Sequence, residues 1–217
     1  MKTKSLFSES DHEAIRRAVV EVEKRTAGEI VPFVVGACDD YDGASWRAAT
    51  LGTTLAALVT VLVHELGGFW GGWFAVWLLA PVLGGGIFGY LAGAFFPVLR
   101  RRLTDPATID ARVRLRAETA FLREEVFATA ERTGILIFLT LLERRVVILG
   151  DSGINAKVQQ HEWDEIVAGI AAGIRAGRPT HALIEGIGRC GELLQRRVEI
   201  RPEDRDELSD ALRISDR

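Results

Sequence analysis

Apolar residues recur at helical spacing in several parts of the chain. In the first of these, Ile15, Val19 and Val22 form one stripe, directly after a segment beginning at Ser10 that has the spacing of a capping box. The same one-sided pattern returns further along the chain. It predicts helices, each with one buried face, over residues 10–25, 110–132 and 163–174 and from Thr180 onward.

Three shorter segments have the composition of strands. Residues 28–35 are rich in Val and Ile, and Pro32 within them indicates a sheet edge or a bulge, because Pro cannot donate to a strand ladder. Residues 134–142 form an unbroken apolar run, which is typical of a strand buried on both faces. A tight turn leads to a third strand at residues 145–149. We therefore expect an α/β fold with a small mixed sheet flanked by helices, an α/β/α sandwich.

The longest apolar segment interrupts this pattern. From residue 48 to residue 99 the only acidic, basic or histidine side chains are those of His64 and Glu65, which we place in a turn. The apolar residues before this turn are just numerous enough to cross a bilayer, and those after it predict one long span, kinked near Pro81. The sequence thus predicts a two-helix transmembrane hairpin inserted in the α/β domain.

Charge on the two sides of the hairpin sets its expected orientation. Arginines cluster after the second span, whereas no Lys or Arg occurs between the spans, so both termini should face the cytoplasm across the inner membrane. The flanking segments can then fold together on one side. The expected organisation is a first part of the domain, a hairpin, a second part of the domain and a charged tail that docks loosely, over residues 1–47, 48–99, 100–198 and 199–217.

Overall composition excludes several functions. The net charge is −3 over 217 residues, so the clustered basic surface of a nucleic-acid binder is not expected. Cys38 and Cys190 lack the spacing of a zinc site. None of the glycine-rich phosphate loops, HExxH or GxSxG occurs. The expected partners are the lipid bilayer and another membrane or cytoplasmic protein, and an oligomer is compatible with the pattern.

Acidic side chains gather near the expected sheet edges. If the first two strands are parallel, their starts share one edge with the end of the third strand. The candidates at this edge are Thr26, Glu29, Thr133 and Asp151, and those at the opposite edge are Asp39, Asp40, Asp42 and Glu143.

Two kinds of role are open for these acids. Asp39, Asp40 and Asp42 have the close oxygen spacing that a hard cation prefers, although an ordinary solvated acidic turn is the simpler interpretation of them. Asp151 is either a ligand or part of an ordinary turn before a helix. The candidate metal ligands are therefore Asp39, Asp40 and Asp151, for calcium or another divalent cation. Glu29 and Glu143 are further binding candidates.

The order of elements resembles the TPM domain family, in its membrane-embedded bacterial branch. The matching segments are Thr26–Ile30, Thr133–Phe138, Leu142–Ile154, Trp163–Val167 and Glu207–Leu212. The resemblance implies an α/β sandwich, with divalent-cation binding in some soluble members and a proposed acid phosphatase activity in chloroplast members. Other members act in photosystem repair or receptor modulation.

These observations favour a binding function. We expect a membrane-anchored binding or assembly module whose cytoplasmic domain engages another protein, with control by a divalent cation as a further expectation. The alternative is a divalent-dependent, acid-phosphatase-like hydrolase that uses Asp39, Asp40 or Asp151. Whether the protein catalyses a reaction is left open by the sequence.

Overall fold

The computed structural model describes residues 7–67, 73–197 and 208–215 and divides the chain into two compact units. One unit combines the described residues of 1–38 with those of 110–217, and the other consists of residues 39–109. Segments on either side of the apolar insertion therefore fold together, as the sequence predicts.

The first unit is built around a four-stranded mixed sheet. Its strands are β1 (Ile30–Val35), β2 (Ile135–Thr140), β3 (Arg145–Gly150) and β4 (Arg213–Ser215), in the order β3-β2-β1-β4. β1 is parallel to both β2 and β4, whereas β2 and β3 form an antiparallel hairpin. The expected mixed sheet is confirmed, with β1 and β2 at its centre.

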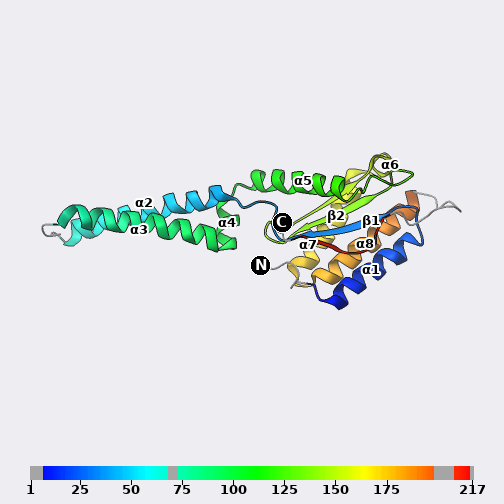
Figure 1. Ribbon diagram of the computed structural model, residues 1–217, viewed down its shortest axis with the longest axis horizontal. Coiled ribbons are helices and arrows are strands. Elements are labelled where there is room, and N and C mark those ends of the chain that lie inside the picture. The colour runs from blue at the N-terminus through cyan, green and yellow to red at the C-terminus, as the bar shows by residue number, and fades with distance from the viewer. Residues whose placement is uncertain (1–6, 68–72, 198–207, 216–217) are drawn as a thin grey trace. The chain divides into compact units, whose positions relative to one another are not determined.

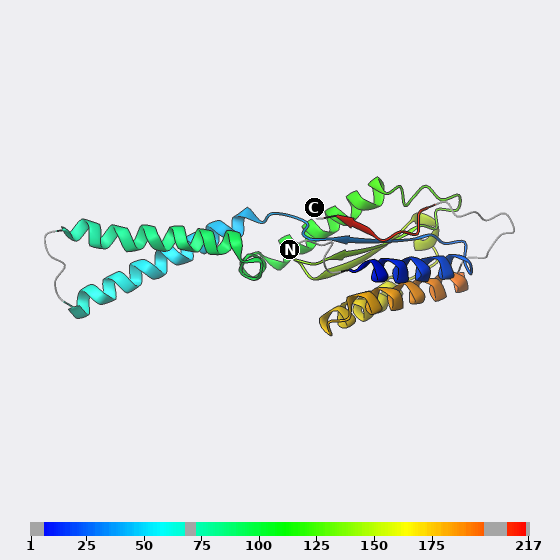
Figure 2. The same ribbon diagram turned by 60° about the horizontal axis from the view of Figure 1, so that its bottom comes forward.

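Helices cover both faces of this sheet (Figures 1 and 2). One face carries α1 (Glu9–Glu23), α7 (Gln160–Arg175) and α8 (Pro179–Arg197), and α5 (Pro106–Arg123) lies along the other from Asp110 onward. Every residue of β1 and β2 is buried, which explains why both segments are apolar throughout rather than alternating.

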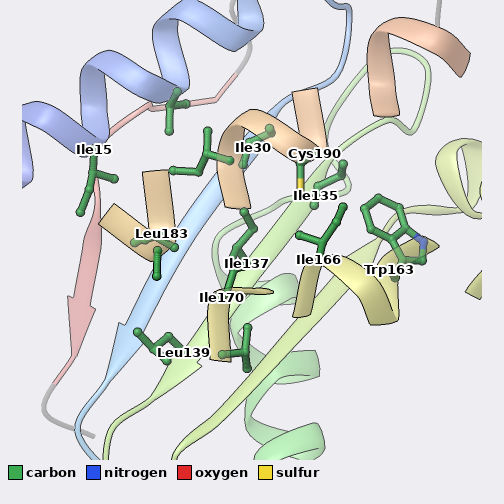
Figure 3. Packing of buried hydrophobic residues seen from close by; sticks show 14 of the residues in the cluster. Ile15, Ile30, Ile135, Ile137, Leu139, Trp163, Ile166, Ile170, Leu183 and Cys190 are labelled. Atoms are coloured by element: carbon green, nitrogen blue, oxygen red, sulfur yellow. The ribbon is translucent and has the colours of Figure 1, made fainter. Parts of the chain in front are cut away.

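The main core lies between the sheet and the face that carries three helices. Ile135, Ile137 and Leu139 of β2 point toward Ile170 and Leu183 of the helices (Figure 3). Odd-numbered positions of β2 meet this core because side chains alternate along a strand. The even-numbered Phe138 points the other way and stacks on Phe33 of β1 at a centroid distance of 5.6 Å.

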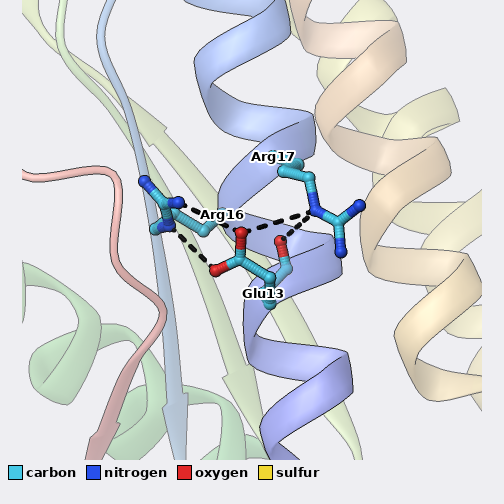
Figure 4. Close-up of polar contacts among 3 residues, drawn as sticks. All are labelled: Glu13, Arg16 and Arg17. Carbon is cyan, nitrogen blue, oxygen red and sulfur yellow. Dashed lines mark hydrogen bonds and ion pairs between the residues drawn. The ribbon is translucent and has the colours of Figure 1, made fainter.

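The helix α1 shows both faces of the expected amphipathic pattern. Ile15 and Val19 are buried, while Glu13 on the exposed side accepts hydrogen bonds from Arg16, at 3.1 Å, and forms an ion pair with Arg17 (Figure 4). The hydrogen bonds from Arg16 lower the pKa of Glu13. The capping box is formed by Ser8 and Asp11, so the helix begins before the predicted start at Ser10.

The predicted helix over residues 110–132 is wrong at both ends. α5 begins at Pro106 and ends at Arg123, where Glu125 adopts a positive φ of 53° and the Val126 N–H bonds back to the Phe121 carbonyl. Val126 is then buried against Gly134, at a distance that leaves no room for a Cβ. The end of the helix thus places Val126 in a buried position next to the start of β2.

The second unit is an antiparallel pair of long helices, α2 (Asp42–Gly67) and α3 (Phe74–Phe95), followed by the short α4 (Pro97–Leu103). Small residues bring the two backbones together. A Cβ added to Gly85 would lie 2.6 Å from the Gly52 carbonyl oxygen, and one added to Gly93 would lie 2.7 Å from Ser45 Cα. Such close contact is typical of helices that pack through glycine.

Two details of this hairpin differ from the prediction. His64 and Glu65 lie within α2 rather than in a turn, because the helix continues to Gly67. Pro81 lies inside α3, and the kink expected near it stays a prediction. The second span ends at Phe95 rather than continuing to residue 99, and Pro97 opens α4 after Phe96. A residue that precedes Pro is driven out of the helical conformation, and Pro fits the first turn of the next helix.

The end of the chain is more ordered than the sequence predicts. Arg213–Ser215 form β4 beside Phe33–Val35 of β1, and the side chain of Leu212 is buried. The expectation of a loosely docked tail is wrong for these residues. Pro32 lies just outside the part of β1 that pairs with β4, which agrees with the edge position expected for a proline.

Candidate functional site

The parallel pairing of β1 and β2 brings the predicted residues together at the start of both strands. Thr133 Oγ1 donates a hydrogen bond of 2.9 Å to the Ala27 carbonyl, and the Asp151 N–H donates one of 2.9 Å to the Gly134 carbonyl. The side chains of Thr26, Glu29, Thr133 and Asp151 are all buried at this edge. The expected juxtaposition is therefore present.

Asp151 performs two structural tasks at this edge. Its Oδ1 accepts a 2.6 Å hydrogen bond from the Ser152 N–H, which caps the short helix α6 (Ser152–Asn155). Its Oδ2 lies 2.7 Å from Nε of Arg132, an ion pair between a buried carboxylate and a half-exposed guanidinium.

A further acid at this edge, Glu23, is absent from the sequence-based candidates. Its Oε1 accepts a 2.9 Å hydrogen bond from the Ile30 N–H, so the last residue of α1 holds the first residue of β1. Burial, the proximity of Glu29 and a hydrogen bond with Asp210 raise the pKa of Glu23 to about 9, against the opposing effect of the Ile30 N–H. Glu23 is therefore protonated at neutral pH.

The sequence does contain a signal for Glu23. It follows Ile15 and Val19 at intervals of four residues, so it lies on the buried stripe of α1 rather than on the exposed face. An acid on an apolar stripe indicates either a partner or a perturbed pKa. The sequence contains no comparable signal for Asp210, because its proximity to α1 depends on where the end of the chain docks.

Glu143 holds the opposite end of the sheet together. Its carboxylate is buried and accepts a 2.8 Å hydrogen bond from the Cys38 N–H, and the neighbouring Leu142 N–H donates to the Gly36 carbonyl at 3.0 Å. These contacts join the β2–β3 turn to the segment that leaves β1. Glu143 thus fixes the position at which the chain departs toward the second unit.

The three aspartates after β1 belong to the second unit. Oδ1 of Asp39 accepts a 2.7 Å hydrogen bond from the Asp40 N–H, and Asp42 is the exposed first residue of α2. Across residues 7–67, 73–197 and 208–215, no group of three His, Cys, Asp or Glu side chains is arranged to hold a metal ion. A calcium or other divalent-cation site at Asp39, Asp40 or Asp151 stays a prediction.

A cavity of about 200 Å³ opens between α5 and the strands β1 and β4, and the sequence did not indicate it. Phe33 and Ala120 contribute apolar walls, and the charged side chains at the cavity are those of Arg116, Arg123, Glu124 and Arg213. Arg213 Nε lies 2.5 Å from Glu124 Oε2. The cavity depends on β4, so it could not be found before the position of the tail was known.

Comparison with known proteins supports the fold. No protein-family model matches the sequence, and no curated protein matches it either. The structure is similar to the NMR structure of the BA42 protein from the psychrophilic bacterium Bizionia argentinensis, with a TM-score of 0.61 and 19% sequence identity over 99% of each chain. At this identity the similarity establishes a shared fold.

The charged side chains of the first unit therefore fall into two groups: acids that bind the backbone, and the charged residues at the cavity. Asp151 and Glu143 each bind backbone N–H groups, and Asp151 also neutralises Arg132. These are the contacts of residues that hold a fold together. The cavity at α5 and β4 differs, because it combines an open volume with an excess of positive charge.

Proposed function

We propose that the protein is a membrane-anchored binding module. In this proposal α2 and α3 cross the inner membrane as a hairpin, and the α/β unit lies in the cytoplasm, where it engages another protein. The observation that carries the proposal is the exposure of two long apolar helices.

The dimensions of both helices suit a bilayer. The candidate spans are Asp42–Gly67, with 26 residues and a mean hydropathy of 1.5, and Ala75–Phe95, with 21 residues and a mean hydropathy of 1.7. At 1.5 Å per residue these are about 39 Å and about 31 Å long, against a hydrocarbon core of about 30 Å. Each helix is long enough to cross.

The exposure of these helices argues against a soluble-core role. Only 6% of each apolar window is buried within the structure, whereas a core helix of a soluble protein would be mostly covered. Large apolar side chains are exposed along both helices, including Leu55, Leu62, Leu83 and Phe88. An apolar surface of this extent requires a covering, and lipid provides one.

Three threonines of α2 form hydrogen bonds within the helix. The hydroxyl groups of Thr50, Thr54 and Thr60 donate to the carbonyl groups four residues earlier, at 3.0, 2.8 and 2.7 Å. A hydroxyl group in hydrocarbon has no water to bind, so such internal bonds lower the cost of its insertion. The threonines are therefore compatible with a membrane span.

Arginine placement supports the orientation with both termini in the cytoplasm. Arg100, Arg101 and Arg102 follow α3 within α4, and the chain between Arg47 and Arg100 contains no Lys or Arg. Within this unit, Arg47 Nη1 donates to the Leu103 carbonyl at 2.6 Å, and Arg100 donates to the Ala94 carbonyl. The two ends of the hairpin are joined at the positively charged side.

Membership of the TPM domain family is part of the proposal. The motif Thr26–Ile30 leads into β1, Thr133–Phe138 leads into and includes most of β2, and Leu142–Ile154 contains the β2–β3 turn, β3 and the start of α6. The similar segments thus lie at the centre of one sheet and at its two ends. Such a placement is expected of motifs that specify a domain.

Membrane topology is the direct test. In a Cys38→Ser background, single cysteines would replace Leu66, Ser10 and Ser209, which are all exposed. We expect an impermeant maleimide to label Leu66→Cys in intact bacterial spheroplasts, and to label Ser10→Cys and Ser209→Cys only after the membrane is opened.

Labelling of opened spheroplasts is the control for reactivity at each site. The remaining Cys190 is fully buried, and burial raises the pKa of its thiol to about 12, so it contributes little background. Release of the protein from membranes by alkaline carbonate, or equal labelling of Leu66→Cys and Ser10→Cys in intact spheroplasts, would show that α2 and α3 do not span.

A further inference from the structure

The cavity between α5, β1 and β4 lies toward the carboxyl ends of two parallel strands. It is lined by Phe33 of β1, by Ile214 and Ser215 of β4 and by Ala120 of α5. Ligands of open α/β sheets commonly bind near this end of parallel strands. All of the lining residues belong to the first unit, so the cavity is independent of the hairpin.

Positive charge dominates the lining. Arg116, Arg123 and Arg213 face a single acid, Glu124, and that acid is paired with Arg213 at 2.5 Å. Within the described part of the chain, Arg116 and Arg123 have no hydrogen-bond or ion-pair partner. Two guanidinium groups at the same cavity therefore have no counter-charge from the described residues.

Two other arginines of this unit are paired with acids. Arg114, on the same helix but outside the cavity, lies 3.0 Å from Glu118, and Arg145 lies 2.7 Å from Asp110. Arg114 and Arg145 thus have acids beside them, whereas Arg116 and Arg123 have none among the described residues. Bringing like charges to one cavity is unfavourable unless an anion binds there.

We infer that this cavity is a binding site for a phosphate group. Arginine presents a planar fork of donors that matches phosphate oxygens, and two such forks can bind one tetrahedral anion. A volume of about 200 Å³ is smaller than typical pockets for drug-sized ligands, which begin at about 300 Å³, and suits a phosphoryl group with a small attached portion. The group is carried by a free phosphorylated molecule or by a lipid headgroup.

Phosphate binding to the purified full-length chain is the first measurement. Inorganic phosphate would be titrated calorimetrically into the protein in neutral detergent, comparing the parent with Arg116→Gln, Arg123→Gln and Arg114→Gln. We expect saturable binding that weakens about tenfold or more in the first two variants, because each loses a charge-assisted hydrogen bond, and stays unchanged in Arg114→Gln.

Arg114→Gln is the matched control, because it removes the same charge from the same helix outside the cavity. Equal weakening in all three variants would mean a diffuse electrostatic effect and would overturn the inference. The folding of each variant is checked by the reactivity of the Cys190 thiol, which is buried in the core and so reports exposure of the core.

A second experiment distinguishes a lipid headgroup from a free phosphorylated molecule as the source of the phosphate group. The protein would be reconstituted in phosphatidylcholine vesicles with or without phosphatidic acid, and phosphate affinity measured in each. If phosphatidic acid weakens the apparent binding of phosphate to the parent but not to Arg116→Gln, the cavity binds a lipid headgroup. If phosphatidic acid has no effect on phosphate binding, the cavity binds a free phosphorylated molecule. Absence of phosphate binding in detergent and in both kinds of vesicle would overturn the site, whatever the topology of the hairpin.

Discussion

At the scale of single residues, buried and partly buried carboxyl groups hold the α/β unit together. Asp151, Glu143 and Glu23 each accept a hydrogen bond from a backbone N–H at an end of the sheet. Their surroundings differ, because Asp151 has Arg132 as a counter-charge, whereas burial and the nearby acids Glu29 and Asp210 raise the pKa of Glu23.

Glu23 should make the α/β unit less stable as pH rises. Its pKa is about 9 in the folded protein, against an ordinary value of 4.5 for a solvated glutamate, so the unfolded chain releases the proton first. The free energy of unfolding should therefore fall between about pH 4.5 and pH 9, by at most about 1.4 kcal/mol per pH unit from this group. Urea unfolding followed by labelling of Cys190 measures this slope.

Glu23→Gln keeps an oxygen acceptor for the Ile30 N–H and cannot ionise. We expect this variant to be more stable than the parent at pH 8 and similar to it at pH 5. Glu21→Gln, on the exposed side of α1, is the control. Parallel stability curves for the parent and Glu23→Gln would show that Glu23 does not titrate in this range.

Asp151→Asn should destabilise the unit even without any metal ion. The substitution removes an ion pair with Arg132 and weakens the cap of α6, which together cost about 1–2 kcal/mol. Asp42→Asn, at an exposed position, should change stability by less than about 0.5 kcal/mol. The measurement is urea unfolding of both variants in a chelating buffer.

Adding calcium to the same samples tests the predicted cation site. If Asp151 is a ligand, calcium stabilises the parent and not Asp151→Asn. A stability difference that is unaffected by calcium assigns Asp151 to the fold alone. Asp39→Asn and Asp40→Asn test the other candidates in the same way.

At the scale of elements, the α2–α3 pair depends on glycines at particular positions. Gly85 contacts Gly52 and Ala56, whereas a Cβ at the adjacent Gly84 would meet no atom within 4 Å. Neighbouring residues of α3 thus have different roles: one faces the partner helix and the other faces outward. Sequence alone shows three successive glycines without this distinction.

A paired substitution tests this contact. A Cβ built at Gly86 lies 3.9 Å from Thr53 Cβ, a distance that suits a disulfide, so Thr53→Cys with Gly86→Cys reports the approach of the helices. We expect the added Gly85→Leu to reduce oxidative cross-linking several-fold and Gly84→Leu to leave it unchanged. Equal cross-linking in both would mean that the helices do not pack through Gly85.

At the scale of the whole molecule, the α/β unit is completed by the two ends of the described chain. α1 precedes the apolar insertion, and β4, the last element along the chain, closes the edge of β1. β4 also forms one wall of the phosphate cavity. Stability and the proposed binding are therefore coupled through the last described residues.

Removing residues 208–217 should expose the edge of β1 and part of the core. Leu212 is buried and Ile214 packs against the core, so we expect faster labelling of Cys190 and a greater tendency to aggregate. Removing only residues 216–217 is the control. Unchanged labelling after the longer deletion would show that β4 does not contribute to the stability of the unit.

The sequence by itself determined the type of most elements and the nature of the insertion. Apolar stripes located α1, α7 and α8, apolar segments located β1 and β2, and the absence of charge located the hairpin. Each of these patterns is local in the sequence. Only the tertiary structure decided that Glu23 meets Glu29 and Asp210, that β4 joins β1 and that three arginines share a cavity. Those contacts join residues far apart in the sequence, and their register follows from packing that local patterns do not contain.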